Sequence, residues 1–188
     1  MLRRRSATPA LGCAIAIALG AVASGCASEA AGEPRREGLA IPLGGVTYNV
    51  YITRQLNLDD PEDRGYSELP EAPPGFTYYG VFLEACNESD EPLRTASSFH
   101  IEDQQGDEFS PVALEPDNPF AYRPTTLAPD TCIPEAGSLP ALGPTGGALL
   151  VFEIPLDATE NRPLELAISQ GFDPETAGPR QLLFELDI

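Results

Sequence analysis

Apolar and polar residues alternate along much of the chain, and this period of two predicts β-strands. The alternation is clearest in VTYNVYIT (46–53), where every second residue from Val46 onward is apolar. Further strands are expected at 76–86, 97–103, 109–114, 146–156, 163–168 and 180–188, with a short one near Phe120–Thr126. No segment sustains a helical period, so about seven or eight short strands separated by turns predict an all-β sandwich.

The polar stretches between these strands divide into turns and two long loops. FTYYGVFLEAC (76–86) is apolar on both faces, which indicates a strand covered on both sides near the middle of a sheet. An acidic, proline-rich loop is expected from Asn57 to Pro74. Seven prolines between 115 and 147 predict a second long loop, because each proline removes a backbone N–H donor.

The N-terminal 25 residues have the pattern of a secretory signal. Three arginines (3–5) precede LGCAIAIALGAVA (11–23), an uncharged stretch that is short for a membrane-spanning helix. It ends in ASGC (23–26), which resembles the lipobox of bacterial lipoproteins, with Ala23 at the position usually held by leucine. We therefore predict cleavage before Cys26 and lipidation of its thiol. An ordinary cleaved signal and a retained helix are the alternatives.

This pattern divides the chain into a lipoprotein signal peptide at 1–25, a lipidated cysteine with a flexible tether at 26–44, and a folded domain at 45–188. The tether is small, polar and interrupted by Pro and Gly, as flexible linkers are. Each buried acyl methylene contributes about 0.8 kcal/mol, so two chains hold a protein stably on a bilayer. The expected location is the extracytoplasmic face of the cell membrane, with the lipid as the only membrane contact.

Charge narrows the range of partners. The full chain has 11 basic residues, all arginine, and 29 acidic ones, for a formal net charge of −18. Once the signal and its three arginines are removed, eight basic residues stand against 29 acidic ones, a net charge of −21. Such a surface repels nucleic acid and anionic lipid, so neither is expected to bind the folded domain. A basic protein or cations are compatible with it.

The cysteines fit export. Cys13 leaves with the signal and Cys26 takes lipid, so Cys86 and Cys132 remain and predict one disulfide in an oxidising compartment. Closing a loop of this length stabilises a fold by about 4 kcal/mol in the chain-entropy model. Two buried thiols are the alternative. No metal site or cofactor is expected from them, because CxxC spacing is missing and His100 is the only histidine.

The order of the segments resembles a known family. YYGVFLEACNESDEPL (78–93) includes an Asn-x-Ser turn, FHIEDQQGDEF (99–109) includes Gly-Asp, and GGALLVFEIPLDA (146–158) includes VFEIP. Over about residues 46–169 the chain is similar to the telokin-like lipoprotein domains of Gram-positive bacteria grouped as domain of unknown function 4352. The resemblance implies an immunoglobulin-like sandwich in exported, often lipid-anchored proteins, with no general enzymatic activity and no shared catalytic residues.

Candidates for chemistry are few. His100 is the only imidazole, and strand alternation places Ser98 and Glu102 on the same face as His100. Neighbouring positions on one strand create no oxyanion hole, so a solvated strand face is expected. The sequence contains no H-E-x-x-H, P-loop or G-x-G-x-x-G motif. We therefore predict no enzymatic activity and no catalytic residue.

The best candidate for cation binding is DDPED (59–63). Calcium takes about six to eight oxygen ligands, and Asp59, Asp60, Glu62 and Asp63 offer several in one loop. The EF-hand spacing and its glycine are missing. An exposed acidic loop is the expectation, and weak calcium capture is the alternative.

Two functions follow from these observations. The first is a non-catalytic binding or interaction module at the bacterial cell surface, whose partner is an unidentified envelope or extracellular protein. Long loops on a rigid sandwich commonly carry recognition. The alternative is a lipid-anchored protein that captures a small ligand or a cation such as calcium.

Overall fold

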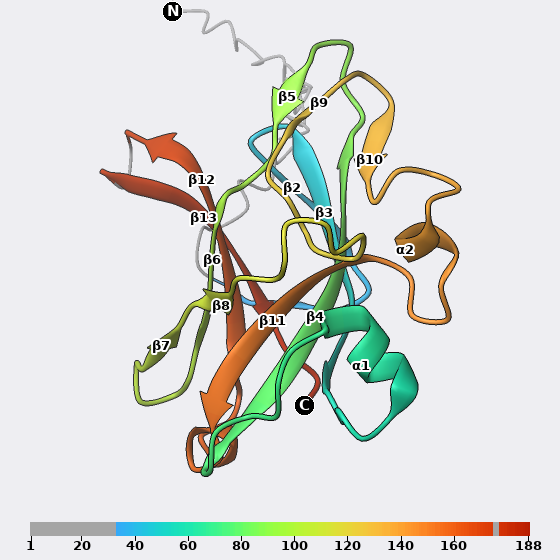
Figure 1. Ribbon diagram of the computed structural model, residues 1–188. Helices are drawn as coiled ribbons and strands as arrows, with labels where there is room; N and C mark the ends of the chain where they lie inside the picture. Colours follow the sequence, from blue (N-terminus) through green and yellow to red (C-terminus); the bar gives the residue numbers. More distant parts are fainter. Residues whose placement is uncertain (1–32, 175–176) are drawn as a thin grey trace, which may run out of the picture.

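The computed structural model of the protein describes residues 33–174 and 177–188, which fold as two facing sheets (Figure 1). The strands are β1 (Arg35–Arg36), β2 (Ala40–Leu43), β3 (Val46–Gln55), β4 (Phe76–Asn87), β5 (Leu93–Arg94), β6 (Ser98–Glu102), β7 (Glu108–Phe109), β8 (Pro111–Val112), β9 (Thr126–Leu127), β10 (Thr131–Ile133), β11 (Ala148–Pro155), β12 (Glu165–Asp173) and β13 (Gly178–Glu185). The helices are α1 (Pro61–Ser67), α2 (Leu139–Leu142) and the 3₁₀ turn η1 (Ala158–Glu160).

The two sheets make the β-sandwich that the alternation predicts. One sheet has the order β1-β13-β12-β6-β7, and the other has the order β2-β3-β4-β11-β8, with β10 also paired to β4. A small ribbon joins β5 and β9. Seven strands in the described part of the chain have four or more residues, which agrees with the expected number.

The main core lies between the sheets and collects the inward positions of the alternating strands. Tyr48 on β3, Ile101 on β6, Leu166 on β12 and Phe184 on β13 are each 0 % exposed there. Burying one large apolar side chain contributes about 1.5–3 kcal/mol, so this layer supplies most of the drive for the two sheets to pack.

A second, smaller core lies on the outer face of the β4 sheet. Phe82 and Val151 are 0 % exposed there, and the ring of Tyr66 on α1 packs edge-on against Phe82 with 5.4 Å between centroids. Figure 1 shows α1 on the side of this sheet that faces away from β12 and β13. The expectation that 76–86 is covered on both sides is therefore confirmed.

The acidic, proline-rich segment from Asn57 to Pro74 was expected to be a loop throughout, which is wrong because α1 lies within it. The Asp60 side chain caps the helix by accepting a hydrogen bond from the Glu62 N–H at 2.7 Å, and Pro61 occupies the first turn. Arg54 on β3 then pairs with buried Asp63 at 2.5 Å. A cap and an ion pair to the sheet thus hold a helix too short to show a period.

The expectation of a flexible tether as far as residue 44 also needs correction, because β1 and β2 lie within 26–44. β2 forms an antiparallel hairpin with β3, in which Gly44 and Gly45 have φ angles of 61° and 88°. Leu43 is buried and Ile41 packs against the main core. The apolar AIPL sequence (40–43) is therefore the first half of a hairpin, and the fold begins before residue 45.

The proline-rich region departs from expectation in detail. The strand expected at 109–114 splits into β7 and β8, which belong to different sheets. The strand expected near Phe120–Thr126 is reduced to an isolated bridge between Ala121 and Leu149 and to the start of β9. β10 was not expected, and it continues the pairing along β4 beyond Ala148, the first residue of β11.

Candidate functional site

The described surface has an apolar hollow of about 410 Å³ between the 118–125 segment and the β10–α2 region. Polar groups of Arg123, Glu135 and Ser138 also line it. Its apolar lining includes Pro119, Ala121, Ile133, Pro134, Leu139 and Pro140. Concave sites lined by apolar side chains with a few polar groups are where proteins usually bind ligands or partner side chains.

Asn118 fixes the first wall of the hollow. Its side chain is 4 % exposed, and its Nδ2 donates a hydrogen bond to the Tyr66 carbonyl of α1 at 2.9 Å. Its Oδ1 accepts hydrogen bonds from the N–H groups of Phe120 at 2.9 Å and Ala121 at 3.2 Å. One buried amide therefore ties this wall to α1 and sets the turn that leads along it.

The second wall is fixed by a close backbone approach. The Gly147 N–H donates to the Pro140 carbonyl of α2 at 3.0 Å. Gly147 has a φ of 115°, and a Cβ at this position would lie 2.9 Å from the Leu83 backbone nitrogen. Only glycine fits here without displacing β4, so α2 is held at a defined position beside the sheet.

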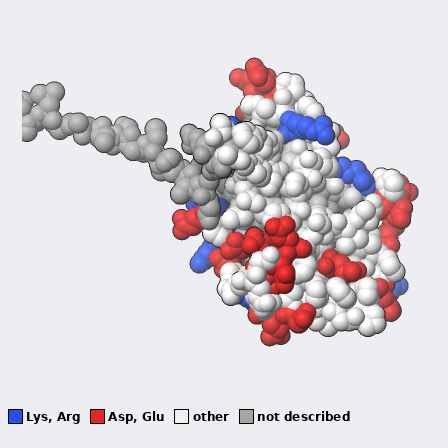
Figure 2. Space-filling view, turned by 90° about the vertical axis from the view of Figure 1, so that its left-hand side faces the viewer, with Lys and Arg blue, Asp and Glu red and all other residues white. Residues whose placement is uncertain are grey.

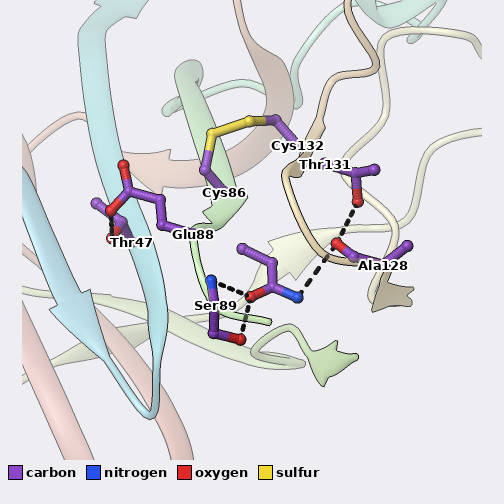
Figure 3. The surroundings of a disulfide bond; sticks show 8 residues. Thr47, Cys86, Glu88, Ser89, Ala128, Thr131 and Cys132 are labelled. Atoms are coloured by element: carbon purple, nitrogen blue, oxygen red, sulfur yellow. Dashed lines mark hydrogen bonds between the residues drawn. A yellow bond between two sulfur atoms is a disulfide. The ribbon is translucent and has the colours of Figure 1, made fainter. Parts of the chain in front are cut away.

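The disulfide predicted between Cys86 and Cys132 is confirmed, and it braces the same wall (Figure 3). The two residues are direct partners across β4 and β10, with 4.1 Å between their Cα atoms. β10 has only three residues, and Ile133 at its end lines the hollow. The covalent bond therefore supports a strand that few backbone hydrogen bonds could hold.

Asn87 joins the turn after β4 to the segment before β10. It is 1 % exposed, and its Nδ2 donates to the carbonyls of Glu91, Leu127 and Ala128 at 2.8, 3.2 and 3.1 Å. Its Oδ1 accepts from the backbone N–H and the hydroxyl of Ser89 (Figure 3). The Asn-x-Ser triplet therefore acts through turn chemistry.

One polar group in the hollow has no partner in the fold, whereas another is already hydrogen-bonded. The Ser138 hydroxyl is buried and has no hydrogen-bond partner among the described residues. Arg123 is exposed, and one of its Nη atoms donates to the Glu115 carbonyl at 2.5 Å. A buried hydroxyl without a partner is uncommon in native proteins, so a bound group that supplies an acceptor would satisfy Ser138.

The four carboxylates considered for calcium binding have different contacts in the folded protein. Asp63 is 4 % exposed and holds Arg54, whereas Asp60 caps α1. Asp59 and Glu62 are exposed. The loop therefore does not direct the four carboxylates at one point.

Another group of candidate metal ligands is occupied by the disulfide. Within residues 33–174 and 177–188, the one set of three potential ligand atoms that lie within 4.8 Å of one another comes from Glu84, Cys86 and Cys132. Both cysteine sulfurs are joined to each other, so neither is a thiolate ligand.

His100 lies where the sequence places it. Ser98, His100 and Glu102 share the outer face of β6, with Phe99 and Ile101 turned inward. Ser98 and Glu102 are exposed and His100 is half-buried opposite Ala167 of β12. The shared face is confirmed, and the three residues follow one another along a single strand.

Glutamates from four neighbouring strands form a row on this outer face. Successive Cα partners are Glu185, Glu165, Glu102 and Glu108, from β13, β12, β6 and β7. Figure 2 views the molecule from this side and shows acidic side chains grouped near the middle. Burial, followed by the charges of Glu102 and Glu185, raises the pKa of the Glu165 carboxyl above its usual value. The sequence gives no sign of this row, because it depends on the register between strands.

Replacing Glu165 by glutamine is expected to stabilise the protein at pH 7 by about 0.5 kcal/mol, since like charges directly opposite on a sheet repel. Because the pKa of Glu165 is raised in the folded state, ionisation destabilises that state above the raised pKa. The gain should therefore disappear as the pH falls to the ordinary value of 4.5. Urea unfolding at pH 7 and at about pH 4 measures it, with exposed Glu115→Gln as the control. Equal stability of Glu165→Gln and the natural protein at pH 7 would disprove repulsion in the row.

The comparisons with known proteins concern the fold. No family model matches the sequence, and no curated protein matches it, so the resemblance to domain of unknown function 4352 is not confirmed in this way. The fold is similar to that of the yjhA protein from Bacillus subtilis, with a TM-score of 0.50 and 12 % identity over 81 % of this chain and 99 % of that one.

Two further solved structures are similar at a lower level. A candidate lipoprotein (ycdA) from Bacillus subtilis has a TM-score of 0.45 and 11 % identity over 74 % of this chain and 36 % of that one. An uncharacterised β-sandwich protein from Clostridium difficile has a TM-score of 0.42 and 13 % identity over 82 % of this chain and 97 % of that one. At identities this low, no residue role is carried over from these proteins to this chain.

Cys26 and the signal lie outside the described residues, so lipidation stays a prediction. Across the part of the chain that the structure describes, no helix is long and apolar enough to cross a bilayer.

Proposed function

We propose that the protein is a lipid-anchored, extracytoplasmic binding module of the bacterial cell surface, without catalytic activity, and that the hollow beside α2 receives its partner. The observation that carries this proposal is the hollow itself. Its walls are fixed by Asn118, by the Gly147 approach and by the disulfide, so it is a preformed site on a rigid sheet. Preformed sites lose little conformational entropy on binding.

Two independent features support the location. The first 25 residues have the pattern of a signal that ends at a lipobox-like Cys26. The domain has a disulfide between Cys86 and Cys132, and disulfides persist mainly in oxidising compartments. Membership of the telokin-like lipoprotein family, domain of unknown function 4352, is part of this proposal and rests on the order of the sequence segments.

The chemistry of the hollow indicates what the partner presents. Leu139 lines the hollow and is 60 % exposed, and Leu142 on the same helix is 75 % exposed. Leucines exposed to this degree beside an apolar hollow mark an interaction surface. The Ser138 hydroxyl adds one polar group inside it. A partner protein that inserts an apolar side chain and offers one hydrogen-bond acceptor fits this arrangement.

The test captures partners from detergent-solubilised cell envelopes with the full-length protein and two variants. Leu139→Glu adds a charge to the hollow at an exposed position, where a helix N-terminus tolerates glutamate. Leu156→Glu is the matched control, because Leu156 is 51 % exposed and lies outside the hollow. We expect a partner retained by the natural protein and by Leu156→Glu, and reduced about tenfold or more by Leu139→Glu, since burying a charge is costly.

Lipid anchoring at Cys26 is tested in the same cells. Cys26→Ser should move the protein from the membrane fraction to the soluble fraction, and the intact mass of the natural protein should show acyl chains on a chain that begins at Cys26. Equal retention of every captured protein by Leu139→Glu and Leu156→Glu would overturn the role of the hollow. A Cys26→Ser protein that stays in the membrane fraction would overturn the anchor.

A further inference from the structure

We infer that the hollow beside α2 binds the C-terminal residue of its partner chain, with an apolar side chain in the hollow and the terminal carboxylate on Arg123. The inference rests on the role of the hollow proposed above and adds the chemical group that the partner presents there.

The first wall of the hollow directs Arg123 into it. Ala121 and Arg123 line the hollow. Between and before them in the sequence, Tyr122 is buried in the main core and Phe120 packs against the second core. The Leu149 N–H donates to the Phe120 carbonyl at 2.7 Å, and the Tyr122 N–H donates to the Leu149 carbonyl at 2.9 Å, which holds this segment beside β11. Because side chains alternate along it, Arg123 leaves the wall on the same side as Ala121.

The charge of Arg123 is available to a ligand. One of its Nη atoms donates to the Glu115 backbone carbonyl at 2.5 Å, and this acceptor is neutral. Among residues 33–174 and 177–188, no carboxylate lies within 4.0 Å of its guanidinium nitrogens, although the chain has 29 acidic residues. A guanidinium has five N–H donors, so the bond to Glu115 leaves others for a carboxylate.

The second wall supplies a hydroxyl and an acceptor. The buried Ser138 hydroxyl, which has no partner among the described residues, can donate to a carboxylate oxygen inside the hollow. The exposed carboxylate of Glu135 also lines the hollow and repels a further anion on its own side. It can accept a hydrogen bond from the N–H of the terminal residue. The two charges therefore place a bound carboxylate on the Arg123 side.

The charge of the whole protein limits what else can enter. With a formal net charge of −18, the protein repels a partner segment that carries several acidic residues. A C-terminal residue combines one negative charge with an apolar side chain, which aspartate and glutamate do not. It therefore matches both the apolar lining and the single arginine of the hollow.

Small model ligands separate the contribution of the carboxylate from that of the side chain. N-acetyl-leucine has the side chain, the N–H and the carboxylate of a C-terminal leucine, and N-acetyl-leucinamide lacks only the charge. Free leucine has an ammonium group instead of the acetylated nitrogen. Each is titrated into the isotope-labelled full-length protein in detergent micelles, and NMR shifts of the amides that line the hollow give the affinity.

Two arginine variants are compared with the natural protein. Arg123→Gln removes the charge from the hollow. Arg162→Gln is the matched control, because Arg162 is also exposed, also donates to a backbone carbonyl (that of Thr159, at 3.1 Å) and lies outside the hollow.

We expect N-acetyl-leucine to bind at the hollow about fivefold more tightly than N-acetyl-leucinamide, because a charged pair adds to the apolar contact. Arg123→Gln should remove this difference, and Arg162→Gln should keep it. Ser138→Ala should weaken binding of the acid more than binding of the amide. Equal affinity of the acid and the amide, no shift at the hollow with either, or tighter binding of free leucine would overturn the inference.

The capture experiment with Leu139→Glu tests the role of the hollow separately. A partner that is lost by Leu139→Glu but retained fully by Arg123→Gln would confirm the hollow as the binding site and overturn the terminal carboxylate as its ligand. Loss of the same partner by both variants, with retention by Arg162→Gln, is the expected result.

Discussion

Replacing both Cys86 and Cys132 by alanine will lower the free energy of unfolding by about 3 kcal/mol. The cysteines are 46 residues apart, so the bond removes many conformations from the unfolded chain. Bonds that close loops of this length stabilise folds by about 2–4 kcal/mol. Urea unfolding of the oxidised natural protein and of the double variant measures the loss.

The structural consequence should be local as well as global. β10 pairs with β4 through Thr131, Cys132 and Ile133 only. Without the covalent bond, the β10 amides should exchange with solvent much faster than those of β11, which pairs with β4 over eight residues. Because Ile133 lines the hollow, partner binding should weaken with it.

Reduction provides the control for this prediction. Dithiothreitol should destabilise the natural protein by the same amount and leave the double variant unchanged. A loss of under about 1 kcal/mol, with normal protection of β10, would show that backbone pairing alone holds the wall, since disulfides span about 0–5 kcal/mol.

The strands could be predicted because each alternating position reports whether it faces water or core. β3, β6 and β13 lie close to where the period of two places them, and β12 begins within the expected segment 163–168 but continues to Asp173. β4 is apolar on both faces because α1 covers its outer side. The disulfide could be predicted because two cysteines remain once Cys13 is assigned to the predicted signal and Cys26 to the predicted anchor. Local information therefore determines which segments are strands and which of their faces are buried.

α1 was not predicted because the helix is short and the residues that stabilise it lie on β3 and β4, far away in the sequence. The Asp60-Pro61 pair is a helix start, but the seven residues of α1, from Pro61 to Ser67, are too few for a visible period. Tyr66 and Asp63 are buried only because Phe82 and Arg54 lie beneath them on the sheet. From the sequence alone, the many acidic residues of this segment suggest a solvent-exposed loop. Only the contacts with the sheet show that part of the segment is buried.

The hollow and the glutamate row depend on contacts between distant segments. Ile133, Leu139 and Leu142 are apolar residues among prolines. This pattern indicates packed side chains, but it does not identify the segment against which they pack. The row exists because the register pairs Glu165 with Glu102 and Glu185. Register between strands is set by the whole sandwich, so neither feature follows from any single segment.

Removing the ring of Phe82 should destabilise the fold strongly. Its ring is 0 % exposed, packs edge-on against Tyr66 of α1, and lies 5.5 Å from the guanidinium carbon of Arg54. It joins the helix to the outer face of the sheet, within a second core that also includes Leu56, Tyr78 and Leu149. Phe82→Ala should lower the free energy of unfolding by about 3–5 kcal/mol, the usual cost of emptying a buried aromatic site.

Phe76 provides a matched control for this substitution, because it lies on the same strand and by alternation on the same face. It is 39 % exposed, so Phe76→Ala should cost less than about 1 kcal/mol. Urea unfolding gives both values, and hydrogen exchange should show α1 opening first in Phe82→Ala, since Tyr66 has lost its contact. Similar costs for the two substitutions would contradict the existence of a second core, and α1 would then be held mainly by the pair between Arg54 and Asp63.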